Sequence, residues 1–126
     1  MTRQGHHPAV VVETSPMNYQ VWIRLSKDPI PNALATQSAK VLAEHYDGDP
    51  NSADWRHFGR LAGFTNRKPV HMRSSGSPYV LAHDCDGLIA PNAQDILHQA
   101  QTRLQAKDVT KIREFSSAEA CSILCR

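Results

Sequence analysis

The strongest constraint on the fold is a pair of strand-forming stretches joined by a short polar turn. Ala9–Glu13 opens with an unbroken apolar, β-branched run, which is typical of a strand buried on both faces. Tyr19–Leu25 instead alternates apolar and polar positions, as a strand with one face on the core does. Between them, Pro16 has a fixed φ that suits a turn corner. The sequence therefore predicts a hairpin.

Two periodic stretches and one short apolar stretch supply the other expected elements. Helical stripes run through Ala33–Tyr46, which Asn32 would cap, and through Asn92–Phe115. Tyr79–His83 is expected to be a third strand. The predicted fold class is α+β, a small mixed or antiparallel sheet backed by the two helices.

The 126 residues suffice for one domain at most. We expect residues 1–8 to be a disordered leader, 9–90 to form the folded domain, 91–115 to be a C-terminal helix and 116–126 to be a frayed tail. Cys85, Cys121 and Cys125 have no framework spacing, and no stretch is apolar enough to span a bilayer. These features predict a cytoplasmic chain with free thiols and no membrane partner.

The net charge of +2 is too small to indicate nucleic-acid binding, but its distribution is informative. From Trp55 to His83 there is no Asp or Glu. The same stretch contains five strong bases, which are Arg56, Arg60, Arg67, Lys68 and Arg73. Such a stretch favours an anionic partner, although a solvated basic face is the alternative.

Three motifs could carry chemistry. The first is the polar turn of residues 13–20, whose backbone N–H groups could form a small nest for phosphate oxygens; the alternative is an ordinary hairpin corner. The second is Asp47-Gly48-Asp49, which could offer carboxylates to Mg²⁺ or Mn²⁺; the alternative is an Asp-rich turn that bonds its own backbone.

The third motif is residues 54–69, where bases alternate with aromatic residues. A short helix capped by Ser52 would place Trp55, Phe58 and Leu61 on its apolar face. Arg56 and Arg60 would then share a helix face and could grip one polyphosphate. Phe58 and Phe64 are expected in the core rather than as stacking platforms for bases. Gly63–Ser77 is expected to be a long basic loop.

The order of these motifs resembles a known family. Val11–Gln20 contains Val-Val-Glu-Thr-Ser-Pro-Met-Asn-Tyr-Gln, Asp49–Asp54 contains Asp-Pro-Asn-Ser-Ala-Asp, and Arg60–Lys68 contains Arg-Leu-Ala-Gly-Phe-Thr-Asn-Arg-Lys. This order is similar to that of the RepB-like DNA primases of mobilisable plasmids, which belong to the archaeo-eukaryotic primase superfamily and are sometimes fused to a relaxase. The resemblance runs from about Ala9 to about Leu81.

The resemblance implies a nucleotidyltransferase of plasmid replication and mobilisation that primes on single-stranded DNA. It would join nucleoside triphosphates, release pyrophosphate and use two divalent ions, Mg²⁺ or Mn²⁺, held by three carboxylates. A relaxase or helicase is the implied protein partner. Asp49 matches the third carboxylate, which makes it the implied catalytic metal ligand. The implied phosphate- and nucleic-acid-binding residues are Thr14, Ser15, Asn18, Gln20, Arg56, Arg60, Asn66, Arg67 and Lys68.

The sequence departs from the family pattern in one respect. The family places two adjacent carboxylates on a strand before the Glu-Thr-Ser-Pro segment, whereas residues 1–8 contain no acid. We therefore expect an N-terminally truncated primase domain at residues 9–90. One aspartate does not hold two ions against water, so the isolated chain should be inactive or very weak as a primase. A truncated sheet would leave an edge that favours self-association.

Two other interpretations stay open. The chain could be a non-catalytic single-stranded-DNA-binding remnant of a primase or of a relaxase–primase fusion, which the missing acidic pair supports. It could also be a purely structural fragment of a degraded gene.

Overall fold

The computed structural model describes the backbone of residues 5–123 and the side chains of residues 5–110. The chain forms two compact units. Unit 1 contains Met1–Pro29 and Arg56–Gln94, and unit 2 contains Ile30–Trp55 and Asp95–Arg126. The chain therefore leaves unit 1 after the hairpin and returns to it with the basic stretch.

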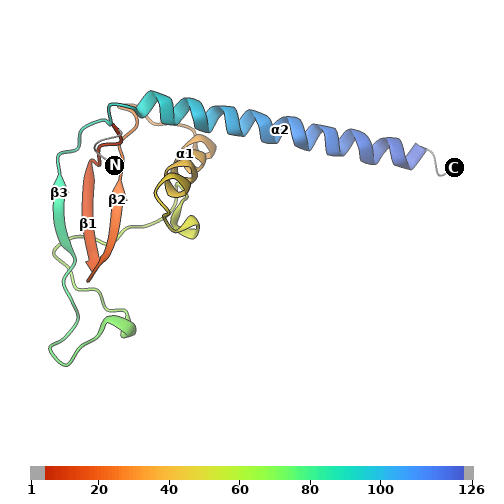
Figure 1. Ribbon diagram of the computed structural model, residues 1–126. Helices are drawn as coiled ribbons and strands as arrows, with labels where there is room; N and C mark the ends of the chain where they lie inside the picture. Colours follow the sequence, from red (N-terminus) through yellow and green to blue (C-terminus); the bar gives the residue numbers. More distant parts are fainter. Residues whose placement is uncertain (1–4, 124–126) are drawn as a thin grey trace. The chain divides into compact units, whose positions relative to one another are not determined.

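Unit 1 is built on a three-stranded antiparallel sheet (Figure 1). Its strands are β1 (Val10–Ser15), β2 (Asn18–Trp22) and β3 (Leu81–Cys85), in the order β2-β1-β3. The predicted hairpin and the α+β fold class are confirmed. The third strand starts at Leu81 rather than Tyr79, because Tyr79 instead forms an isolated bridge with Thr65.

The register of the sheet is interrupted at β3. Val11 lies opposite Asp84, whereas Val12 lies opposite Ala82, so His83 is an extra residue in β3. Such a bulge redirects one side chain relative to the regular alternation. Its consequence for Glu13 is described below.

The core of unit 1 is small and made of short side chains. Ala9, Val12, Val80 and Ala90 are buried. The described part of the predicted leader is held on this unit, since His7 Nε2 lies 2.6 Å from Asp86 Oδ2 and the Gly5 carbonyl accepts from the Asn92 N–H. Residues 1–4 of that leader lie outside the described residues.

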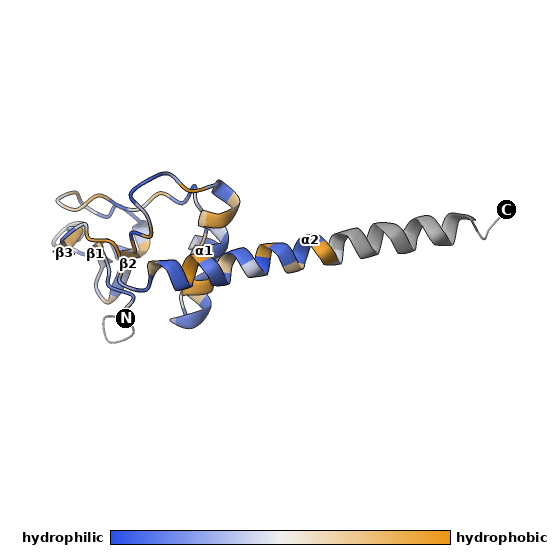
Figure 2. Ribbon diagram, turned by 90° about the horizontal axis from the view of Figure 1, so that it is seen from above, coloured by the Kyte–Doolittle hydropathy of each residue, from blue (hydrophilic) through white to orange (hydrophobic). Residues whose placement is uncertain are grey.

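Unit 2 contains helix α1 (Asn32–His45) and most of helix α2 (Ala93–Ile123). Asn32 is the first helical residue of α1 and not its cap, because Pro31 occupies the cap position and makes no side-chain cap bond. Two polar contacts join the helices: Lys107 Nζ donates to Gln37 Oε1 at 2.9 Å, and Arg103 pairs with Glu44. The described part of α2 is mostly hydrophilic (Figure 2), with Ile96 and Ala100 buried.

Helix α2 is longer than predicted. The expected helix ended at Phe115, whereas α2 continues to Ile123 and so includes most of the predicted tail; residues 124–126 lie outside the described part. Among the described residues, neither α1 nor α2 combines the length and apolarity needed to cross a bilayer. Cys85 is a free, exposed thiol, while the side chain of Cys121 and the whole of Cys125 lie outside the described residues.

Candidate nucleic-acid interface

The hairpin corner, residues 14–18, is closed by its own polar side chains. Thr14 Oγ1 donates to the Asn18 carbonyl at 3.3 Å, and Asn18 Nδ2 donates to Ser15 Oγ at 3.0 Å and to the Pro16 carbonyl at 3.1 Å. Thr14 and Ser15 are buried. The polar side chains of Thr14, Ser15 and Asn18 therefore hold the turn between β1 and β2, and their contact with phosphate stays a prediction.

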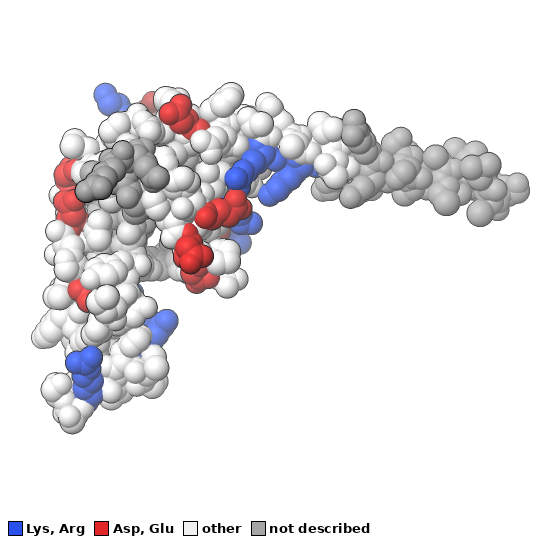
Figure 3. All heavy atoms as spheres, viewed as in Figure 1, with Lys and Arg blue, Asp and Glu red and all other residues white. Residues whose placement is uncertain are grey.

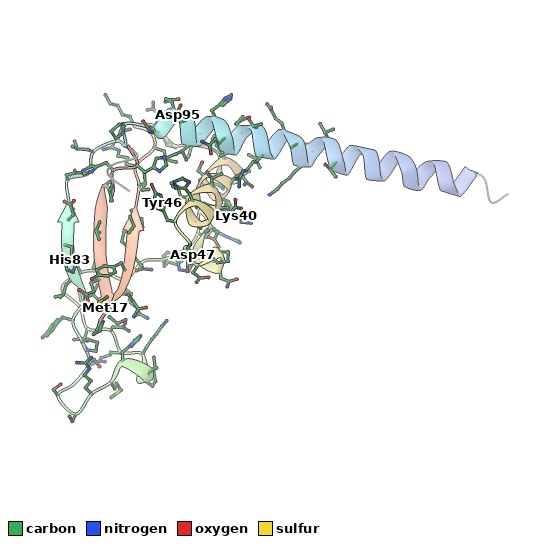
Figure 4. The ribbon with its side chains drawn as sticks, viewed as in Figure 1. Met17, Lys40, Tyr46, Asp47, His83 and Asp95 are labelled. Atoms are coloured by element: carbon green, nitrogen blue, oxygen red, sulfur yellow. The ribbon has the colours of Figure 1, made fainter. Side chains whose placement is uncertain are left out.

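A carboxylate of the protein occupies the position where we expected an anion nest. Met17 lies at the tip of the corner with φ 64° (Figure 4), and its N–H donates to Glu13 Oε1 at 3.1 Å. Glu13 Oε2 lies 2.8 Å from His83 Nε2, which the bulge in β3 brings to this face. The hydrogen bond from His83, followed by that from the Met17 N–H, lowers the pKa of Glu13 below its ordinary value.

The basic segment, Arg56–Lys68, crosses β2 at Gly59 and Arg60. The backbone N–H of Arg60 donates to Gln20 Oε1 at 2.9 Å. Next to it, Gly59 lies so close to the Trp22 ring that a Cβ at this position would be 1.8 Å from Trp22 Cζ2. Gln20 and Trp22, two residues apart on one face of β2, thus fix the path of this segment. The amide oxygen of Gln20 thus positions Arg60, and a direct contact of Gln20 with a ligand stays a prediction.

This close approach explains why the predicted helix after Ser52 is wrong. A single 3₁₀ turn, Pro50–Ser52, is present, and residues 57–61 have no helical structure. Arg56 and Arg60 therefore do not share a helix face. Trp55, Phe58 and Leu61 are exposed, so no apolar stripe is buried that would stabilise a helix there.

Asn66 fixes the far end of the same segment. Its Nδ2 donates to the Thr14 carbonyl at 2.7 Å, and its Oδ1 accepts from the Lys68 N–H at 3.2 Å. Asn66 is 1% exposed, so its amide lies inside the fold of unit 1. We expected Asn66 to contact phosphate; in the structure it joins the basic segment to β1 and sets the direction in which Arg67 and Lys68 leave it.

The basic side chains of this segment face solvent. Arg56, Arg67 and Lys68 are exposed and Arg60 is half-buried. Within the described part of the chain, Arg60, Arg67 and Lys68 form no ion pair, in contrast to Arg103 with Glu44. The loop at the bottom of Figure 3 shows Lys and Arg spheres and no Asp or Glu spheres. Unpaired guanidinium and ammonium groups on a fixed backbone are suited to phosphate.

The acidic turn, residues 47–54, follows α1 in unit 2. Asp47 has φ 53°, and the Gly48 N–H returns to the Ala43 carbonyl, which ends the helix. Asp49 caps the next turn: its Oδ1 accepts from the Asn51 N–H and its Oδ2 from the Ser52 hydroxyl, both at 2.9 Å. This is the backbone-bonding turn that we had weighed against a metal site.

The ligand set for two metal ions is not assembled here. Among the described residues, no group of three or more His, Cys, Asp or Glu side chains gathers in a way that could hold a metal ion. One carboxylate whose two oxygens already accept hydrogen bonds does not fit a two-ion centre. Asp49 as a metal ligand stays a prediction.

Comparison with known proteins identifies the family. Residues 1–108 match the family described as the RepB DNA-primase N-terminal domain. This chain belongs to that family. The resemblance seen in the motif order is thereby confirmed, and the chain is a RepB-like plasmid primase domain of the kind found in proteins of plasmid replication and mobilisation.

Two curated relatives agree with this assignment. Mobilization protein A of Escherichia coli is 43% identical over 122 residues, which cover 94% of this chain and 17% of that protein. A DNA primase of Acidithiobacillus ferrooxidans is 34% identical over 128 residues, which cover 94% of this chain and 36% of the relative. The chain thus spans about a sixth and about a third of these two proteins.

Two solved structures share the fold. A crystal structure of primase RepB′ matches with a TM-score of 0.80 and 41% identity, over 95% of this chain and 41% of that one. The catalytic domain of primase RepB′ in complex with initiator DNA matches with a TM-score of 0.76 and 42% identity, over 86% of this chain and 54% of that domain. The present chain therefore shares the fold of the matched part of this primase catalytic domain, which is about half of that domain.

Two pairs of residues that shape this surface are not predicted by the sequence motifs. Trp22 with Gly59 and Glu13 with His83 are each distant in sequence. The only available signal was a glycine between Phe58 and Arg60, which marks a place where backbone approaches something closely. The sequence offers no signal for the Glu13–His83 pair, because it depends on the bulge in β3.

Proposed function

We propose that this chain is the part of a primase-type nucleotidyltransferase that holds single-stranded DNA and the phosphates of incoming nucleoside triphosphates. The larger protein would act in plasmid replication and mobilisation, with a relaxase or helicase as partner. Arg60, Arg67 and Lys68 are the proposed phosphate contacts. Gln20 and Asn66 position them.

A single observation carries this proposal: an acid-free segment is bonded to the hairpin through the Arg60 N–H and the Asn66 amide, while Arg60, Arg67 and Lys68 form no ion pair within the described residues. The Arg60 N–H bonds Gln20, and the Asn66 amide bonds the Thr14 carbonyl. Charge that is fixed in place before binding loses less conformational freedom when phosphate arrives. The similarity to a RepB′ catalytic domain that was crystallised with initiator DNA supports the same assignment.

The nucleotidyl-transfer step itself is proposed for the larger protein and not for these residues alone. In that step the 3′ hydroxyl of one nucleotide would attack the α-phosphorus of a triphosphate and displace pyrophosphate, and the divalent ions that the family implies would stabilise the attacking and leaving oxygens. The described residues do not assemble the carboxylates for it. We therefore expect no primer synthesis from the isolated chain. Synthesis of labelled primers at the level of a longer homologue would contradict this expectation.

The non-catalytic alternative is favoured by the same missing ligand set. In that case the chain would bind single-stranded DNA with the same residues and would make no primer in any context. Fusing the chain to the remainder of a longer homologue distinguishes the two, because only the catalytic assignment predicts recovery of primer synthesis.

The binding experiment uses the salt dependence of affinity for a single-stranded oligonucleotide, measured without Mg²⁺. Each phosphate contact on a single strand contributes about 0.7 to the slope of log affinity against log salt. Lys68→Ala and Arg67→Ala should each lower affinity and reduce that slope by about 0.7. Lys40→Ala, which removes an exposed lysine from α1, is the matched control and should change neither. No binding by the unaltered chain would refute the proposal.

A further inference from the structure

Two phenylalanines of the basic segment are exposed, against our expectation that they belong to the core. Phe58 is 92% exposed and Phe64 is 64% exposed. Isolated exposed apolar side chains are common, but two phenyl rings six residues apart on one short segment are unusual. Their exposure therefore calls for an explanation.

The anchors of the segment prevent these rings from turning inward. Besides the bonds at Arg60 and Asn66, the Gly63 N–H donates to the Val80 carbonyl at 2.9 Å and the Phe64 carbonyl accepts from the Val80 N–H at 2.8 Å. Phe58 adjoins Gly59, which lies against Trp22. The chain is thus fixed on both sides of Phe64 and on the C-terminal side of Phe58, and these contacts rather than apolar packing set the position of the rings.

The charge around the rings indicates the kind of occupant. Between Trp55 and His83 the chain has five Arg or Lys and no Asp or Glu, and Arg60, Arg67 and Lys68 form no ion pair within the described residues. A purely apolar partner would leave these charges unmatched and desolvated. Single-stranded DNA matches both features, because it presents phosphates to the bases of the protein and flat unpaired nucleobases to aromatic rings.

We propose that Phe58 and Phe64 stack on unpaired bases of single-stranded DNA while Arg60 and Lys68 hold the adjacent phosphates. This inference rests on the proposed function and deepens it, since it assigns recognition of the bases to two residues that the sequence predicts in the core. Stacking of a base on an aromatic side chain changes affinity by about tenfold or more. It requires a nucleobase and is indifferent to salt.

The test compares two oligomers of equal length, an oligothymidine and an abasic deoxyribose-phosphate chain. Phe58→Ala and Phe64→Ala should each weaken binding of oligothymidine by about tenfold. Binding of the abasic oligomer and the salt slope should stay unchanged. Phe58→Trp should restore affinity because it keeps a stacking surface. Lys68→Ala should weaken both oligomers and lower the salt slope.

The control is Leu88→Ala, which removes an exposed apolar side chain from unit 1 outside the acid-free stretch. It should leave both affinities unchanged. Thermal unfolding of each variant checks that the fold is intact. Because both rings are exposed, their removal should leave the melting temperature unchanged. Vesicles containing phosphatidylserine form a third arm, and we expect no binding to them that depends on Phe58.

Each outcome separates this inference from the proposed function. If the unaltered chain binds neither oligomer, the proposed function fails. If it binds both through Lys68 but the phenylalanine variants lose nothing, or lose equally on both oligomers, then stacking is wrong and phosphate binding stands. Loss of vesicle binding in Phe58→Ala, with oligothymidine binding retained, would assign the rings to a lipid surface instead.

Discussion

The acidic turn and the basic segment looked like equal candidates in the sequence, but the structure uses their polar side chains in opposite ways. In the acidic turn, Asp49 bonds the backbone and hydroxyl of its own turn. In the basic segment, the backbone is bonded to other parts of unit 1, while Arg67 and Lys68 extend into solvent. A carboxylate on one methylene reaches local N–H groups easily, whereas the side chains of Arg67 and Lys68 carry donors only and are long enough to reach past their own backbone. In these two motifs, the short carboxylate of Asp49 thus builds its own turn, whereas the long side chains of Arg67 and Lys68 stay exposed.

The largest effect is expected when one glycine in each region is replaced by alanine. Gly59→Ala places a Cβ against the Trp22 ring and should destabilise unit 1 by roughly 3 kcal/mol, with loss of single-stranded-DNA affinity. Gly48→Ala is the counterpart in the acidic turn, where the nearest atom is Ala43 Cα at 3.3 Å, and it should cost much less. Chemical denaturation measures both. The cost of Gly59→Ala should fall in a Trp22→Ala background, and an unchanged cost would mean that the ring is not the cause.

The next effect concerns Asn66. Asn66→Ala leaves the buried Thr14 carbonyl without its donor and should cost about 2 kcal/mol of unfolding free energy. Affinity for single-stranded DNA should fall as well, because the backbone N–H of Lys68 loses the Asn66 oxygen that holds it in place. Asn51→Ala is the control in the acidic turn, since Asn51 contributes its backbone N–H to Asp49. A stability loss from Asn51→Ala as large as that from Asn66→Ala would contradict the assigned difference.

A smaller effect is expected at Asp49. Asp49→Ala removes a cap and should lower stability by about 1 kcal/mol without changing DNA affinity in the absence of Mg²⁺. Asp49→Asn keeps one acceptor for the Asn51 N–H and should lose less. We expect the melting temperature of the isolated chain to be insensitive to Mg²⁺. A Mg²⁺-dependent increase that Asp49→Asn abolishes would show that the carboxylate binds metal in addition to capping.

The smallest effect is a pH dependence at the hairpin corner. Contacts from His83 and the Met17 N–H hold the pKa of Glu13 below its ordinary value of 4.5. The stabilisation is therefore present above pH 4.5 and is lost as the pH falls through the lower folded-state pKa. Near neutral pH the unaltered protein should have a higher melting temperature than the Glu13→Gln variant. This difference in melting temperature should shrink as the pH is lowered. A difference that grows at low pH would refute this, and His83→Gln should reduce it at all pH values.

Much of unit 1 followed from the sequence because its pattern is local. The β-branched run, Pro16 and the alternation after it specify the hairpin, and the same residues together with Arg60–Lys68 identify the family. The helix predicted after Ser52 is not formed, and the reason is non-local. The apolar spacing suited a helix, but Gly59 packs against Trp22 of β2, which lies far back in the chain. The burial predicted for Phe58 and Phe64 failed with it.

The sequence by itself determined the α+β class, the hairpin, the family and the position of the acid-free stretch, since periodicity, turn chemistry and charge order are properties of neighbouring residues. Only the tertiary structure decided which polar side chains form hydrogen bonds within the protein and which stay exposed. Gln20 and Asn66 became anchors and Glu13 became the partner of the Met17 N–H, whereas Arg67 and Lys68 stayed exposed. The physical reason is that a hydrogen bond depends on which groups folding brings within reach, and pairs such as Asn66 with Thr14 are separated by 52 positions in the chain.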